Sequence, residues 1–177
     1  MRPLRRASCQ TLDNMNLSIR VEPVNHSSVP EALRIHALQM AAYLQEAELI
    51  GAMDFPPLSL TVEDLQFSPG QFFGAYIGAH FVGSTSIELR GEGRVDISSF
   101  VVAPERHRQG VGRALLRYLT KRHCGDRLEV QTAALNYPAI ALYLQGGFVE
   151  VRRWLVGARP LELVALRRYP ASAQNVV

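Results

Sequence analysis

The chain has 177 residues, of which 47% are hydrophobic and 20% are charged, and its net charge is +3. This balance is typical of one globular domain with a substantial core, and so small a positive excess gives little support for a nucleic-acid partner. No stretch approaches the roughly 18 apolar residues of a membrane span, and no apolar segment of a signal peptide follows the early arginines. The two cysteines, Cys9 and Cys124, show neither a disulfide framework nor a metal-binding pattern. The composition therefore predicts a cytoplasmic protein with no metal, nucleic-acid or membrane partner.

The first strand-like pattern begins at residue 15. Leu17, Ile19 and Val21 alternate with polar residues, which predicts a half-buried strand that Pro23 interrupts. We therefore assign the chain to three parts, which are a disordered tail at 1–14, a single domain at 15–170 and a C-terminal tail at 171–177.

The next segment has the spacing of a long amphipathic helix. After Ser28, apolar residues recur every three or four positions to about Ile50, and Gly51 ends the pattern. The apolar positions expected to face the core are Leu33, Ala37, Met40, Ala41 and Leu44. Residues 54–58 (DFPPL) read as a loop, because paired prolines fix φ and remove backbone donors.

The rest of the chain alternates strand and helix patterns. A short helix at 61–67 precedes strands at 71–77, 81–89 and 95–102. After Pro104 the pattern changes from period 2 to period 3.6, which predicts a helix from about residue 111 to residue 123. A strand at 128–132, a helix capped by Asn136 and a hairpin of strands at 148–156 and 161–168 complete the order.

The junction after the strand at 95–102 has the features of an anion site. It reads His107-Arg108-Gln109-Gly110-Val111-Gly112. Glycines let the backbone approach a ligand closely, and the free N–H groups at the start of a helix attract anions. Taken alone, the same glycines would equally serve a tight turn.

Two longer stretches resemble a known family. Residues 101–116 (VVAPERHRQGVGRALL) resemble the acyl-CoA-binding motif of the GNAT superfamily of N-acyltransferases, and residues 136–148 (NYPAIALYLQGGF) resemble its second motif. The resemblance implies an α/β (α+β) GNAT fold, with a central mixed, mostly antiparallel sheet of about six to seven strands flanked by about four helices. It also implies transfer of an acetyl group from acetyl-CoA, as co-substrate, to a primary amine of a small molecule or peptide. A non-catalytic CoA-binding regulatory module is the alternative.

The resemblance also implies which residues hold the CoA. The family's loop begins with Arg or Gln, and here His107 occupies that position, while Gly110 and Gly112 match the two small residues that follow. Backbone N–H groups of residues 108 to 113 would bind the diphosphate whatever side chain stands at position 107. The expected CoA contacts are Val101, Val102, His107, Arg108, Gln109, Gly110, Val111, Gly112, Arg113, Asn136 and Tyr143.

The reaction calls for further groups. An alkylammonium has a pKa of about 10.4, so the attacking amine needs a base or a proton path to solvent. Asp96, and Glu88 acting through a water, are candidate bases, although either would also suit a solvated strand end. The family implies an unpaired backbone N–H near Val101 or Val102 that stabilises the oxyanion, and Tyr143 at the position of the general acid.

The sequence does not identify the amine that accepts the acetyl group. In the resembled fold the first helix, the 54–58 loop and the closing hairpin flank the cofactor, so they are expected to form the acceptor site. Glu46, Glu48 and Asp54 would suit a cationic amine or, equally, a solvated helix face. The resemblance to the family also implies a possible homodimer, for which the sequence indicates no interface.

Overall fold

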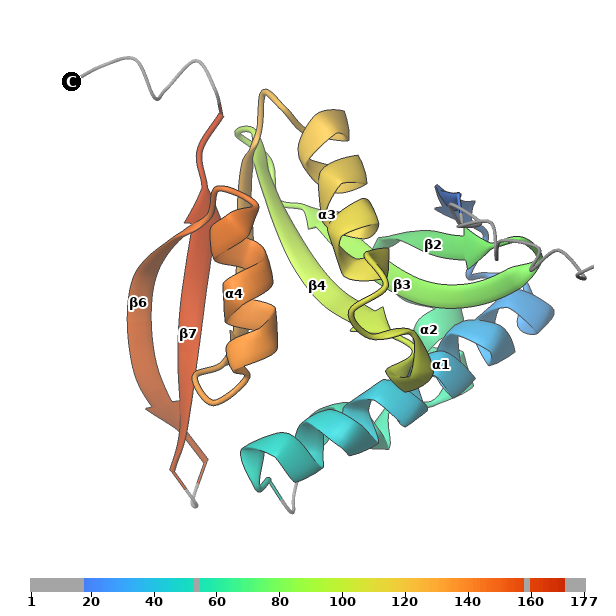
Figure 1. The fold of residues 1–177 in the computed structure, drawn as a ribbon, viewed down its shortest axis with the longest axis horizontal. Helices are drawn as coiled ribbons and strands as arrows, with labels where there is room; N and C mark the ends of the chain where they lie inside the picture. The colour runs from blue at the N-terminus through green and yellow to red at the C-terminus, as the bar shows by residue number, and fades with distance from the viewer. Residues whose placement is uncertain (1–17, 53–54, 158–159, 171–177) are drawn as a thin grey trace, which may run out of the picture.

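The computed structural model describes residues 18–52, 55–157 and 160–170 (Figure 1). Within them one sheet contains seven strands, which are β1 (Ile19–Val24), β2 (Gln71–Ile77), β3 (His80–Leu89), β4 (Arg94–Val102), β5 (Arg127–Ala133), β6 (Val149–Val156) and β7 (Leu161–Arg168). The α-helices described are α1 (Val29–Ile50), α2 (Val62–Gln66), α3 (Val111–Arg122) and α4 (Tyr137–Gln145), and short 3-10 helices span Pro56–Ser59 and Pro104–Arg106. None of the described helices combines the length and hydropathy of a membrane span.

The strand order is β1-β2-β3-β4-β5-β7-β6, and every neighbouring pair except β4 and β5 is antiparallel. The predicted mixed, mostly antiparallel sheet with flanking helices is therefore confirmed. Helices α3 and α4 pack on one face through the larger core cluster, whereas α1 and α2 pack on the other. Phe72 and Phe73 show the alternation, because Phe72 joins the cluster with α1 and α2 and Phe73 joins the cluster with α3.

The sheet divides between β4 and β5. These two strands pair only from Arg94 to Ile97 of β4. Opposite β3, the register shifts so that Ile97 faces Ile87 but Ser99 faces Ser86, which leaves Ser98 as the extra residue of a β-bulge. Beyond the bulge β4 follows β3 while β5 follows β7, so the two halves of the sheet splay apart (Figure 1).

Helix α1 has the predicted length and ends at Gly51, whose φ of 65° suits a glycine C-cap. The face that it buries is not the predicted one, however. The predicted core positions Leu33, Ala37, Ala41 and Leu44 are exposed and Met40 is only partly buried. The buried positions are Ala32, Ile35, Gln39, Tyr43 and Ile50. The reason is that α1 lies partly over serines, since the Gln39 side chain donates to Ser99 Oγ at 3.4 Å.

The first strand also differs from its prediction. It continues through Pro23, which pairs in register with Phe73. Proline is tolerated there because β1 is an edge strand of the described sheet and needs no second ladder. The expected tails at 1–14 and 171–177, the strand residues 15–17 and Asp54 lie outside the described residues, and the domain limits stay a prediction.

Candidate active site

The loop between β4 and α3 gathers backbone donors at the start of α3. Arg108 and Gly110 both have left-handed backbones, with φ of 63° and 87°. Such turns direct successive N–H groups towards a common concavity. Gly110 is the N-cap of α3, no side chain caps the helix, and its first turn holds no acidic residue. The N–H groups of this first turn are therefore available to an anion.

Side chains of the loop brace its backbone. The His107 ring contacts the Val102 carbonyl at 3.2 Å, and the Gln109 amide donates to the Glu105 carbonyl at 3.0 Å. Both side chains fold back on the loop itself, so the backbone donors are held in place by contacts within the loop.

Gly112 marks the point where α3, α4 and β4 meet. A Cβ at this position would lie 3.2 Å from Leu142 Cδ2 and 3.7 Å from side-chain carbons of Phe100 and Val102. The Leu142 side chain of α4 would have to shift by a few tenths of an ångström, whereas the contacts with β4 would be ordinary van der Waals contacts. The glycine therefore keeps the helix start close to the splay.

The backbone of β4 presents donors to the splay. Ala103 N–H donates to Val82 of β3 at 2.9 Å, whereas the Val102 carbonyl faces the other way and contacts His107. Because backbone groups alternate along an antiparallel strand, the N–H of Val102 points into the splay and that of Val101 points towards β3. Of the two predicted oxyanion donors, Val102 has the suitable direction.

Tyr143 is buried beside the splay. Its side chain is 3% exposed and packs edge-on against Phe100, with ring centroids 5.7 Å apart. Burial, and then the negative charges of Glu46 and Tyr43, raise the pKa of Tyr143 above its ordinary value. The hydroxyl group is therefore protonated at neutral pH and able to donate.

Asn136 joins α4 to α1. Its Oδ1 accepts from the Ala139 N–H at 3.2 Å and so caps α4 as predicted, while its Nδ2 donates to Glu46 Oε1 at 2.8 Å. Burial raises the pKa of Glu46, and the hydrogen bond from Asn136 partly opposes that rise. Asn136 and Tyr143 are seven positions apart, so they share one face of α4. The structure thus brings Glu46, Asn136 and Tyr143 together.

The two predicted bases lie elsewhere. Asp96 Oδ2 is 2.8 Å from Arg90 Nε, and Glu88 Oε2 is 2.7 Å from Arg90 Nη2. Val95 and Ile97 belong to the core that contains Tyr143, so alternation places Asp96 on the opposite face of the sheet. The structure does not bring Asp96 or Glu88 together with Tyr143, because both carboxylates pair with the Arg90 guanidinium instead.

The comparisons with known proteins identify the family. The model of the acetyltransferase (GNAT) family matches residues 33–148. The chain belongs to the GNAT acetyltransferase family. It is also 32% identical, over 158 residues, to the UPF0157 protein YqkA of Bacillus subtilis, a match that covers 89% of this chain and 46% of that protein. The chain thus spans about half the length of this relative.

Solved structures share this GNAT fold. The ribosomal-protein-S18-alanine N-acetyltransferase of Escherichia coli superposes with a TM-score of 0.68 at 17% identity, covering 90% of this chain and 99% of that one. A Bacillus subtilis acetyltransferase in complex with CoA superposes with a TM-score of 0.61 at 14% identity, covering 86% and 99%. At these identities the likeness concerns the fold. The family itself binds acetyl-CoA or CoA.

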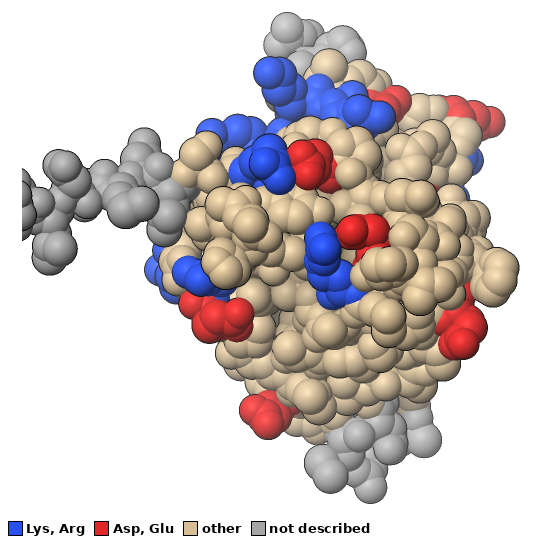
Figure 2. All heavy atoms as spheres, turned by 90° about the vertical axis from the view of Figure 1, so that its right-hand side faces the viewer, with Lys and Arg blue, Asp and Glu red and all other residues tan. Residues whose placement is uncertain are grey.

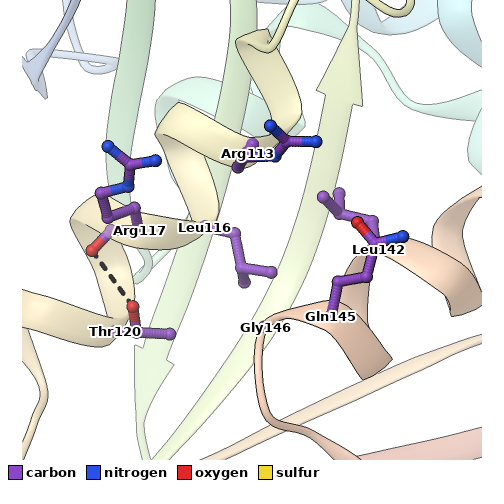
Figure 3. Close-up of a pocket in the computed structure, with 7 residues that line it drawn as sticks. All are labelled: Arg113, Leu116, Arg117, Thr120, Leu142, Gln145 and Gly146. Carbon is purple, nitrogen blue, oxygen red and sulfur yellow. Dashed lines mark hydrogen bonds between the residues drawn. The ribbon is translucent and has the colours of Figure 1, made fainter.

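A groove lies between α3 and the C-terminal half of α4 in this GNAT domain. It encloses about 350 Å³ between α3 and α4. Leu116 and Leu142 extend from the two helices into the space between them, and Arg113 and Arg117 lie on α3 (Figure 3). The groove therefore combines two apolar side chains with two cations of α3, of which Arg113 lies in the first turn and Arg117 in the middle of the helix. Its lining residues are Arg113, Leu116, Arg117, Thr120, Leu142, Gln145 and Gly146.

A different face of the domain carries charges of both signs. Figure 2 shows basic side chains mostly beside acidic ones there. Among the described residues, Arg20 pairs with Glu22 at 2.9 Å and Arg34 pairs with Glu31 at 3.5 Å. This mixed pattern differs from the continuous basic stripe that nucleic-acid-binding surfaces carry.

Proposed function

We propose that the chain is an acetyl-CoA-dependent N-acetyltransferase that acts on a primary amine of a small molecule or peptide. The observation that carries the proposal is that an anion-binding loop and a protonated tyrosine lie at the same splay of the sheet. The backbone donors of residues 108–113 begin α3 at the open end of the β4–β5 splay, and the protonated Tyr143 is buried beside the same splay.

The loop and the groove would hold the CoA. Backbone N–H groups of residues 108–113 suit a diphosphate, because they are fixed donors at the positive end of a helix dipole. Arg113 and Arg117 would add charge-assisted contacts to phosphate oxygens. His107 would act through the loop backbone that it braces, since its ring already contacts the Val102 carbonyl.

The remaining residues would serve the transfer. Acetyl-CoA supplies an activated thioester, whose carbonyl carbon an amine attacks. The Val102 N–H is directed into the splay, where it would donate to the carbonyl oxygen; one such donor contributes roughly 10²–10³ in rate. Tyr143 would donate its hydroxyl proton to the departing sulfur, and Asn136 would contact the pantetheine arm while it caps α4.

Direct attack in a ternary complex is preferred to an acyl-cysteine. Cys124 is exposed and follows the C-terminus of α3. The catalytic groups described above lie at the other end of that helix. The amine would therefore react with the thioester itself.

The proposal is tested by following free thiol release from acetyl-CoA with propylamine, spermidine and a peptide that begins with alanine, the residue named for the Escherichia coli neighbour. Tyr143→Phe should lower kcat by about 10²–10⁴ with little change in acetyl-CoA affinity. Tyr137→Phe is the matched control, because Tyr137 lies on the same helix and is 67% exposed. Binding of acetyl-CoA without amine-dependent release would instead support a non-catalytic CoA-binding module.

A further inference from the structure

We infer that Glu46 is the residue that receives the proton of the amine substrate, and that its carboxylate selects amines that arrive as cations. The inference rests on the proposed function, and it assigns to α1 a catalytic group that the motifs after residue 96 do not contain.

The splay gives Glu46 access to the catalytic side of the sheet. Gln39, Tyr43, Glu46 and Ile50 recur at helical spacing, and they place Glu46 on the buried face of α1. In Figure 1, α1 runs beneath the open end of the splay towards α4. There Glu46 Oε1 meets Asn136 Nδ2 at 2.8 Å. Groups from opposite faces of a continuous sheet could not meet in this way.

Among the residues that the structure describes, no cation contacts the Glu46 carboxylate. Among the described residues Glu46 forms no ion pair, whereas Glu88 and Asp96 both pair with arginines. Within the described part of the chain, the titratable groups that face it are Tyr43 of its own helix and Tyr143 of α4. A partly buried carboxylate without a positive partner is unfavourable, and a substrate ammonium would supply that partner.

The same surroundings favour proton transfer. Burial raises the pKa of Glu46, which brings the carboxylate closer to the working pH of a general base. Within the described residues, Asn136 is the one hydrogen-bond partner of the carboxylate, so the second oxygen is left for a further donor.

The proton and electron balance is complete without another reactant. The substrate ammonium gives one proton to Glu46, and the neutral nitrogen forms a bond to the acetyl carbonyl carbon. The carbon–sulfur bond breaks, and the sulfur keeps the electron pair and takes the proton of the Tyr143 hydroxyl. A second proton leaves the nitrogen and restores that hydroxyl. The proton on Glu46 passes to water, so the products are the amide, the free thiol and one proton.

A purely structural role for Glu46 makes a different prediction. If the side chain only braced α1 against Asn136, a glutamine would serve equally well, because its amide oxygen can accept the same hydrogen bond. Glu46→Gln therefore removes the charge and keeps the brace. Glu48→Gln is the matched control, because it makes the same change at an exposed position of the same helix.

The experiment compares two kinds of amine at pH 8. The first is whichever of propylamine, spermidine and the alanyl peptide gives the fastest thiol release with the wild type. The second is 2,2,2-trifluoroethylamine, whose fluorines leave it largely neutral at this pH. Glu46→Gln should lower kcat/KM for the cationic amine by about 10²–10⁴ but for trifluoroethylamine by less than about tenfold, because a neutral amine needs no proton acceptor before attack. Calorimetry should also show weaker binding of the cationic amine to the CoA-saturated variant, with acetyl-CoA affinity unchanged.

The outcomes separate the two proposals. If none of the amines causes the wild type to release thiol from acetyl-CoA, the proposed function is wrong, and this inference is wrong with it. If the wild type is active and Glu46→Gln keeps its kcat/KM for the cationic amine, or loses activity equally with both amines, the inference alone is overturned. Loss of acetyl-CoA binding in Glu46→Gln would also overturn it.

Discussion

Replacing Gly110 with alanine tests whether the strained loop before α3 depends on glycine. Gly110 has φ of 87°, and a Cβ built on it would approach only Ile19 Cδ1, at 3.8 Å. The substitution therefore adds no steric clash, and its cost is the left-handed backbone, about 1–2 kcal/mol for an alanine. The alanine also restricts the unfolded chain, which offsets roughly 0.4–1 kcal/mol of that cost.

Gly125→Ala is the control that isolates the strain. Gly125 is exposed, has no left-handed φ, and a Cβ built on it would meet nothing within 4 Å. It should gain the unfolded-state benefit without the strain. The difference in unfolding free energy between the two variants should thus be about 1–2 kcal/mol, with Gly110→Ala the less stable.

Urea denaturation of both variants measures this difference, and thermal melts should show it as a gap of roughly 2–8 °C in Tm for a chain of this size. Equal stability of the two variants would refute the reasoning, because it would mean that the loop relaxes to an ordinary backbone. Calorimetry with acetyl-CoA adds a second readout, since a relaxed loop would no longer direct its N–H groups to one point.

Three further predictions concern other parts of the molecule. Ile35→Ala should cost about 2–5 kcal/mol whereas Leu33→Ala should change stability by no more than about 0.5 kcal/mol, and urea denaturation that reversed this order would contradict the observed face of α1. Asp96→Asn should keep kcat/KM for any active amine within about threefold of the wild type, because Asp96 pairs with Arg90 on the face opposite Tyr143. A fall in kcat/KM of about 10² or more would instead identify Asp96 as the base. Because the pKa of Glu46 is raised in the folded protein, the folded protein binds a proton at this carboxyl group more tightly than the unfolded chain does. The stability that this bound proton contributes is therefore lost as pH rises from the pKa of the unfolded chain through the raised pKa. Glu46→Gln should therefore be at least as stable as the wild type at pH 8, with the gain disappearing in acid, and a variant that is less stable at pH 8 would contradict this sign.

The features that follow from local sequence were predictable. Gly110 and Gly112 lie within six residues of one loop, and Asn136 and Tyr143 lie within two turns of one helix, so spacing alone brings each pair together. Asn136 caps α4 because an asparagine before a proline-containing first turn does so in most contexts. The succession of strands and helices along the chain followed from the alternation of patterns, and the fold class followed from the family resemblance.

The features that depend on distant contacts were not predictable. Glu46 and Asn136 are 90 residues apart, and they meet only because a bulge at Ser98 turns β4 away from β5. Apolar spacing on α1 pointed to the wrong face, because that helix buries Gln39 over Ser99. One signal in the sequence could have indicated the buried face of α1, because Tyr43 and Glu46 recur at helical spacing after Ile35 and Gln39.

The most direct test of the account is a calorimetric titration of acetyl-CoA into the wild type, Gly110→Asp and Gly125→Asp. The aspartate at position 110 would place its own negative charge at the N-terminus of α3, where the diphosphate should bind. The account predicts saturable 1:1 binding to the wild type and to Gly125→Asp, and a loss of at least about tenfold in affinity for a folded Gly110→Asp. No binding to the wild type, or equal binding to all three proteins, would contradict it.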